Sequence, residues 1–168
     1  MLTVIITGPT CSGKGQVAFE LARRIGGEII SLDSMKVYRF MDIGTAKPPP
    51  ERRARVRYHL IDVADPDEEF NLGRYVREAL NCAAEILARG KTPIFAGGTP
   101  LYLWGLVRGF CSAPPGDPSV RARLEQRAER EGTQALHREL ERVDPEAASK
   151  IHPHDRKRIV RALEVWYQ

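Results

Sequence analysis

The sequence is short of cysteine and has no long apolar run, and both shortages exclude classes of protein. Its three cysteines, Cys11, Cys82 and Cys111, have neither the spacing of metal ligands nor that of a disulfide framework. No apolar run approaches the roughly 20 residues that a membrane-spanning helix requires. The first residues, "MLTVIITGPT", lack the charged region and the cleavage site of a signal peptide. We therefore expect a protein of the reducing cytoplasm, without a membrane span or a secretory leader.

Positive charge is in modest excess, and it gathers in two places. The chain of 168 residues carries a formal net charge of +4, and its length suits one domain of ordinary size. Four arginines lie in "ERRARVRYH" (Glu51–His59), and four basic residues lie in "HDRKRIVR" (His154–Arg161). Either cluster alone is typical of a solvated helix face. The two together leave contact with a nucleic acid equally open.

Apolar runs alternate with amphipathic helical patterns, which predicts an α/β fold for most of the chain. Four runs predict strands, the first of them buried: Leu2–Thr7, Glu28–Leu32, Tyr58–Val63 and Thr92–Thr99. Three patterns predict helices: Gly13–Ile25, Leu72–Arg89 capped by Asn71, and Leu101–Gly109. This order predicts a P-loop NTPase-like parallel sheet with helices on both faces. In "DIGTAKPPP", Gly44 and three prolines predict irregular structure.

The composition changes after residue 110. "CSAPPGDPS" has the composition of a linker, and no strand pattern follows it. Asp117 and Asp144, each followed by proline, predict helix starts, and a last helix is expected from about Asp155. We therefore expect a P-loop α/β core over residues 1–112 and a C-terminal helical arm over 113–168. Three aromatic residues at helical spacing are expected in the core: Tyr102, Trp104 and Trp166.

The segment "GPTCSGKG" resembles the phosphate-binding loop G-x-x-x-x-G-K-[ST]. It follows a predicted strand and opens a predicted helix, so that its backbone N–H groups and the ammonium of Lys14 would face an anion. A glycine-rich connection that binds nothing is the alternative. The residues expected to surround a diphosphate or a nucleotide are Gly8, Pro9, Thr10, Cys11, Ser12, Gly13, Lys14 and Gly15.

The last position of this loop departs from the pattern. A serine or threonine hydroxyl normally ligates Mg²⁺ there, and Gly15 has none. Mg²⁺ tolerates retained water molecules. We therefore expect a Mg²⁺ cofactor that is bound through water, with the hydroxyls of Thr10 and Ser12 as its nearest protein donors.

Five segments together resemble the tRNA dimethylallyltransferase family, the tRNA isopentenyltransferases. They are "GPTCSGKG", "DSMKVYRFMDIGTAKP", "YHLIDVADP", "FAGGTPLYL" and "IHPHDRKRIVRALEV", and they occur in this order from one end of the chain to the other. The resemblance implies transfer of a dimethylallyl group from dimethylallyl diphosphate to the N6 amine of an adenine beside the anticodon of tRNA. The loop would then hold a leaving group, and no phosphoryl group would be transferred.

The resemblance also implies roles for single residues. Asp33 would be the general base, Thr99 would bond near the reacting amine, and Lys14 would neutralise the diphosphate. Without the resemblance, Asp33 reads as a turn aspartate and Thr99 as a helix cap. The implied tRNA-binding residues are Asp33, Ser34, Met35, Lys36 and Thr99 in the core, and Arg121, Lys157, Arg158, Ile159, Val160 and Arg161 in the arm. At the position of Lys36 the family often has glutamine.

Family members continue beyond the last residue of this chain with another strand and further helices. We therefore expect an edge strand and an exposed apolar surface here, which would favour poor solubility or self-association. The expected oligomeric state is nevertheless a monomer. Two alternatives stay open: a small P-loop kinase of a nucleoside or metabolite, and a tRNA- or nucleotide-binding protein without catalytic activity.

Overall fold

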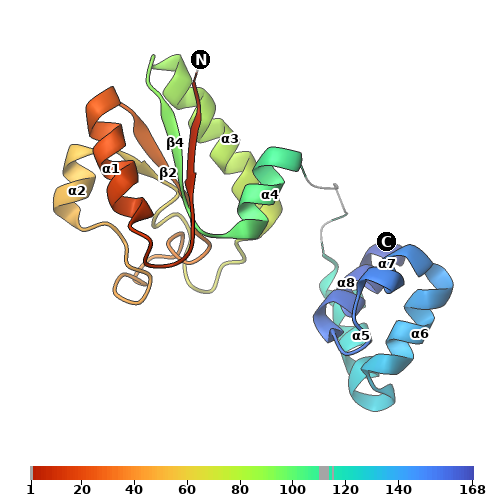
Figure 1. The fold of residues 1–168 in the computed structure, drawn as a ribbon. Helices are drawn as coiled ribbons and strands as arrows, with labels where there is room; N and C mark the ends of the chain where they lie inside the picture. Colours follow the sequence, from red (N-terminus) through yellow and green to blue (C-terminus); the bar gives the residue numbers. More distant parts are fainter. Residues whose placement is uncertain (1, 110–113, 115) are drawn as a thin grey trace. The chain divides into compact units, whose positions relative to one another are not determined.

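The computed structural model describes residues 2–109, 114 and 116–168. The chain divides into two compact units, Met1–Phe110 and Cys111–Gln168, here named the sheet unit and the helical unit (Figure 1). The boundary that the sequence places between residues 112 and 113 lies outside the described residues, as does Cys111. No helix in the described ranges is both long enough and apolar enough to cross a bilayer.

The sheet unit is built on one parallel sheet. Its strands are β1 (Val4–Thr7), β2 (Glu28–Leu32), β3 (Tyr58–His59) and β4 (Pro93–Gly97). Their spatial order is β1-β4-β2-β3, and every pair is parallel. This confirms the predicted fold class, and it makes β1 an edge strand.

Helices cover both faces of the sheet, as predicted. They are α1 (Lys14–Ile25), α2 (Pro50–Arg55), α3 (Leu72–Ala88) and α4 (Pro100–Arg108). Because side chains alternate along a strand, Ile29 packs with Phe19 of α1, whereas Ile30 packs with Tyr75 of α3 on the other face. Figure 1 shows α1 and α3 on opposite sides of the strands.

Three local predictions for the sheet unit were wrong. The third strand ends at His59, because Leu60 and Asp62 have a φ of 58° each and left-handed residues cannot continue a strand. The first strand is not fully buried: Ile5 is 43% exposed. A helix begins at Pro50, inside the proline run, because proline at the first helical position has no N–H to leave unpaired.

The aromatic residues divide between core and surface. Tyr102 is buried and stacks on Tyr75 with ring centroids 3.8 Å apart, as expected of a core residue. Trp104 and Trp166 are 59% and 55% exposed, so their predicted burial was wrong. Trp104 instead lies under the guanidinium of Arg108, whose Cζ is 4.5 Å from the ring centroid.

The helical unit has its own apolar core. Its helices are α5 (Pro118–Glu131), α6 (Thr133–Val143), α7 (Pro145–Lys150) and α8 (Arg156–Trp166). Asp117 and Asp144 accept hydrogen bonds from first-turn N–H groups, which confirms these two predicted caps. Asp155, near which the last helix was expected to begin, caps α8 in the same way. Leucine and isoleucine side chains fill the centre of the unit: Leu124, Leu136, Leu140, Ile159 and Leu163.

Candidate functional site

Three predicted site segments meet at one edge of the sheet. In register, Thr7 at the end of β1 and Leu32 at the end of β2 both pair with Gly97 at the end of β4. The segments that follow these residues are therefore neighbours, although 90 residues separate the first from the last. They are the phosphate loop, the turn of Asp33, and the segment of Thr99. The carboxyl edge of a parallel sheet is where α/β proteins generally bind ligands.

The close approach of these segments depends on Gly97. A Cβ at that position would lie 2.0 Å from the carbonyl oxygen of Leu32, so no other residue fits. At the next position, a Cβ on Gly98 would lie 3.3 Å from the Gly8 oxygen and 3.4 Å from Cε of Lys14. The phosphate loop and the aliphatic part of the Lys14 side chain therefore pack closely against the backbone at the end of β4.

The phosphate loop passes directly into α1. Gly13 has a φ of 79°, and its carbonyl accepts the N–H groups of Gln16 and Val17 at 2.9 and 3.1 Å. As the cap residue it has no side chain that could occupy the other first-turn N–H groups. The Lys14 ammonium folds back across the loop and donates to the Pro9 oxygen at 3.0 Å. Free N–H groups and one ammonium therefore gather at the positive end of α1, an arrangement suited to phosphate oxygens.

The remaining loop residues point in different directions. Ser12 donates its N–H to Pro9 at 3.3 Å, and its hydroxyl lies toward Gly8 at the other end of the loop. Cys11 is exposed and has a φ of 62°. Thr10 lines a separate cavity, described below.

Asp33 uses one carboxylate oxygen to shape its turn. Its Oδ1 accepts the N–H groups of Met35 and Lys36 at 2.9 and 3.3 Å. Its Oδ2 accepts no hydrogen bond from the described residues, and the side chain is half-buried. Asp33 can therefore serve both proposed roles at once: Oδ1 shapes the turn, and Oδ2 is available to act as a general base.

Thr99 connects the end of β4 to the turn of Asp33. Its Oγ1 accepts the N–H of Ser34 at 3.0 Å, and its own N–H donates to the Leu32 oxygen at 3.2 Å. Its hydroxyl makes no capping hydrogen bond to α4. The alternative role as a side-chain cap is thus not realised, and Thr99 holds the Asp33 turn in place.

A cavity of about 690 Å³ adjoins Asp33 and Thr10. Its remaining wall is largely apolar and includes Met35, Met41 and Ile43. Sequence reasoning missed Met41 and Ile43. The available signal was a set of large apolar side chains within an irregular segment, where no helix or strand could bury them. Here a carboxylate oxygen faces an apolar wall, which suits a ligand with a hydrocarbon part beside a proton donor.

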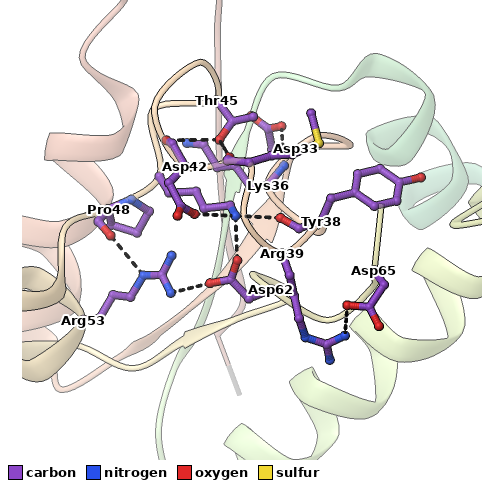
Figure 2. A network of polar contacts seen from close by, with 12 residues as sticks. Asp33, Lys36, Tyr38, Arg39, Asp42, Thr45, Pro48, Arg53, Asp62 and Asp65 are labelled. Atoms are coloured by element: carbon purple, nitrogen blue, oxygen red, sulfur yellow. Dashed lines mark hydrogen bonds and ion pairs between the residues drawn. The ribbon is translucent and has the colours of Figure 1, made fainter. Parts of the chain in front are cut away.

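An ion-pair network holds the segment that carries this wall (Figure 2). The buried ammonium of Lys47 donates to the Tyr38 oxygen, to Asp42 Oδ1 and to Asp62 Oδ1, at 2.6, 2.8 and 2.6 Å. Arg53 donates to the other oxygen of Asp62 at 2.6 Å. Lys47, in the "DIGTAKP" segment, therefore acts by fixing the backbone of this segment.

The network also sets the charge states of its members. Burial alone raises the pKa of Asp62, but hydrogen bonds from Lys47 and Arg53 bring it below its usual value. Burial alone lowers the pKa of Lys47, but its bonds to Asp42 and Asp62 bring it above the usual value. Asp62 and Lys47 therefore stay charged at neutral pH, and their ion pair persists there.

The basic residues predicted on the helical unit are not equivalent. Lys157 and Arg158 are exposed at the start of α8. Ile159 and Val160 are 0% and 2% exposed, so their side chains belong to the core of the unit and not to its surface. The helical period from Lys157 onward turns these two residues inward.

A buried glutamate holds the other two predicted arginines. Glu164 is fully buried, and its Oε2 accepts from Arg121 at 3.0 Å and from Arg161 at 2.7 Å. Burial raises the pKa of Glu164, and the two arginines more than offset this, so that it lies below the usual value. Arg121 and Arg161 thus already have one anionic partner within the protein.

The described residues contain no group of three or more His, Cys, Asp or Glu side chains that could hold a metal. His152 and His154 lie with ring centroids 5.3 Å apart, and the N–H of His154 donates to Nδ1 of His152 at 3.2 Å. The pair shapes a turn before α8.

Family models match both parts of the chain. A model described as IPP transferase matches residues 36–168, and one described as isopentenyl transferase matches residues 1–64. The tRNA dimethylallyltransferase of Methylococcus capsulatus is 56% identical over 164 residues, covering 98% of this chain and 53% of the relative. That of Geobacter sulfurreducens is 54% identical, covering 97% and 52%.

Solved structures agree with the sequence relatives. The full-length tRNA isopentenylpyrophosphate transferase of Bacillus halodurans is 43% identical, with a TM-score of 0.64, covering 97% of this chain and 54% of that one. A eukaryotic dimethylallyltransferase acting on tRNA is 32% identical, with a TM-score of 0.82, covering 98% and 41%. The chain spans about half the length of the curated relatives that it matches.

Proposed function

This chain belongs to the IPP transferase family, and from that premise we propose that it is a tRNA dimethylallyltransferase. The prenyl donor is dimethylallyl diphosphate, and the acceptor is the exocyclic N6 amine of an adenine beside the anticodon of tRNA. The observation that carries the proposal is the shared sheet edge. It brings a phosphate loop, an available carboxylate oxygen and an apolar wall together.

Each part of the site has one task in the reaction. The amine lone pair attacks the allylic carbon, the bond from that carbon to oxygen breaks, and its electron pair leaves with the diphosphate. The first-turn N–H groups of α1 and the Lys14 ammonium stabilise the negative charge that develops on the leaving group. Oδ2 of Asp33 accepts the proton that the amine loses. Met41 and Ile43, in the wall of the adjoining cavity, contact the hydrocarbon part of the donor.

Thr99 and the Lys47 network act through other residues. Thr99 fixes the N–H of Ser34 and, with it, the orientation of the Asp33 turn. Lys47 fixes the segment of the apolar wall. A displacement of the reacting groups by about 1 Å can reduce a rate about 100-fold, so both are positioning residues of some weight.

Contact with tRNA is assigned to exposed charged residues. Lys157 and Arg158 on α8 are proposed to bind backbone phosphates, which positions RNA without reading its sequence. Ser34 and Met35 are proposed to lie beside the target base, which must leave its stack to reach Asp33. A monomer and a cytoplasmic location stay predictions.

Magnesium is the cofactor that a phosphate loop generally implies. The residues around position 15 do not fit it: Gly15 has no hydroxyl, and the charged residues that line the cavity beside it are Lys36, Lys47 and Arg52. No step of the reaction is therefore assigned to a metal. Binding through water with Thr10 and Ser12 stays a prediction.

The proposal is tested with the 168-residue chain, labelled dimethylallyl diphosphate and unmodified tRNA. We expect labelled tRNA to accumulate, and Asp33→Asn to reduce the rate by about 100-fold or more, as loss of a general base does. Inorganic diphosphate should still bind the variant. Asparagine keeps the turn-forming oxygen, so Met35 and Lys36 keep their acceptor. Absence of transfer by the unaltered chain, or an unchanged rate in the variant, would contradict the proposal. Hydrolysis of ATP without transfer to tRNA would favour a kinase-like activity.

A further inference from the structure

A cavity lies beneath the first turn of α1, beside the position where the phosphate loop departs from its usual pattern. Its volume is about 120 Å³. Gly15 and Ala18 of α1 form part of its wall, and Ser31 and Ala96 of the sheet form another part. A threonine or serine at position 15 would present its hydroxyl in this region.

The charged residues in the lining of this cavity are all basic. They are Lys36, Lys47 and Arg52, set in an otherwise largely apolar wall, and no carboxylate is among the described residues that line it. Lys47 already has the two aspartates of its own network. The half-buried ammonium of Lys36 has no hydrogen-bond or ion-pair partner in the part of the chain that the structure describes. A half-buried cation that no carboxylate contacts directly is costly, unless a ligand supplies that contact.

The cavity also contains an unused hydroxyl. Ser31 is 3% exposed, and its Oγ has no hydrogen-bond partner within the described ranges. An unsatisfied buried hydroxyl is destabilising. Since a hydroxyl and an ammonium can both donate to one anionic oxygen, these two groups point to the same kind of ligand.

Lys36 acts on the same site as Lys14. Burial lowers the pKa of the Lys36 ammonium, the Asp33 carboxylate raises it, and the Lys14 ammonium lowers it again. The two ammonium groups therefore repel each other within reach of Asp33. An anion that bridges them would remove this repulsion and satisfy both.

These observations disagree with a metal at this position. Mg²⁺ requires oxygen ligands in a near-octahedral arrangement, whereas Gly15 has no side-chain oxygen and Lys36 lines the cavity beside it. We propose that Lys36 takes the place of the metal ion. Together with Lys14, its ammonium binds the diphosphate of the prenyl donor from the cavity beside Gly15. Diphosphate binding by this chain then does not require Mg²⁺. This inference rests on the proposed function and deepens it.

Calorimetric titration with inorganic diphosphate tests the inference without any turnover. The unaltered chain, Lys36→Gln and Lys36→Arg are titrated in excess EDTA and in excess Mg²⁺. In EDTA we expect the unaltered chain to bind, Lys36→Gln to lose about tenfold or more in affinity, and Lys36→Arg to retain most of it, because the charge is kept. Lys150→Gln is the matched control, since this lysine is exposed in the helical unit and pairs with Glu146 there.

A second substitution asks whether the metal site can be restored. In the Lys36→Gln background, Gly15→Thr should make binding depend on Mg²⁺, because a hydroxyl ligand returns and the competing ammonium is gone. Circular dichroism is used to check that each variant is folded. If Lys36→Gln does not fold, the diphosphate affinity of Lys36→Arg in EDTA still tests the role of the charge.

The outcomes separate the two proposals. Equal affinity of Lys36→Gln and the unaltered chain in EDTA would overturn the role of Lys36 and leave the proposed function standing. Binding by the unaltered chain only with Mg²⁺ would do the same. Absence of diphosphate binding under both conditions would overturn the diphosphate site itself, and with it the proposed function.

Discussion

The sheet unit is expected to lose stability in acid through one buried carboxylate. Glu28 begins β2 and is 2% exposed. Its Oε2 lies 2.7 Å from Nε2 of His59 and accepts from Arg89 at 2.8 Å, and its Oε1 accepts from Lys91 at 2.9 Å. No other carboxylate among the described residues has three side-chain partners of this kind at the start of a central strand.

The partners of Glu28 determine the size of the effect. Burial alone raises its pKa, but the hydrogen bonds from His59, Lys91 and Arg89 more than offset this and lower it from 4.5 to about 2. A difference of this size corresponds to stabilisation on the order of 3 kcal/mol. Because the folded-state pKa is the lower one, the contribution is complete above the unfolded-state value of 4.5 and is lost as the pH falls toward about 2. Neutral glutamine should lack the contribution at every pH.

Hydrogen exchange of the β2 amides measures this contribution in the sheet unit alone. The exchange rates of the unaltered chain and of Glu28→Gln are followed from neutral pH to about pH 3 and corrected for intrinsic exchange. At neutral pH we expect the variant to be less protected by about 3 kcal/mol, and we expect the difference to shrink below pH 4.5. A difference of the same size at pH 7 and pH 3 would refute the reasoning, because it would show that packing and not charge makes Glu28 stabilising.

Two further substitutions concern the segment beside the large cavity. Phe40→Gly should raise the melting temperature, because Phe40 has a φ of 65° and is 82% exposed, and a left-handed bulky residue stores about 1–2 kcal/mol that glycine releases. The same change should raise KM for the prenyl donor, because Phe40 lines the cavity. A lower melting temperature of the variant would contradict the argument that Phe40 is strained. Lys47→Gln should cost about 1.5–3 kcal/mol in denaturant unfolding, because the Tyr38 carbonyl and Asp62 lose a buried charged donor, while Asp62 keeps Arg53 and Asp42 is exposed to water. An unfolding midpoint equal to that of Lys150→Gln would contradict this.

Much of the fold could be predicted because its signals are local. The caps Asn71, Asp117 and Asp155 act on N–H groups two or three residues further on, so the sequence places them next to their partners. The strand, loop and helix around Lys14 are likewise one contiguous segment. Alternation of such segments was sufficient to predict a parallel sheet covered on both faces.

The errors arose where distant or conformational effects decide. The segment "YHLIDV" contains no glycine or asparagine that would predict the left-handed backbone at Leu60 and Asp62, where the third strand ends. The burial of Ile159 and Val160 depends on how α5, α6 and α8 pack, and not on the basic residues beside them. Trp104 fits a helix pattern, yet it is 59% exposed and only Arg108 is recorded over its ring among the described residues.

The sequence by itself determined the class of fold, the phosphate loop and the identity of the residues that could do chemistry, since these depend on short-range periodicity and on residue type. Only the tertiary structure decided what those residues are free to do. It left Oδ2 of Asp33 without a hydrogen bond from the described residues. It paired the hydroxyl of Thr99 with the N–H of Ser34, 65 residues away in the chain, and the ammonium of Lys47 with the carboxylate of Asp62. It also left the ammonium of Lys36, which lines the cavity beside Gly15, without a partner among the residues that the structure describes. The physical reason is that hydrogen bonds and charge pairs between segments far apart in the chain exist only after the sheet has brought its strand ends together.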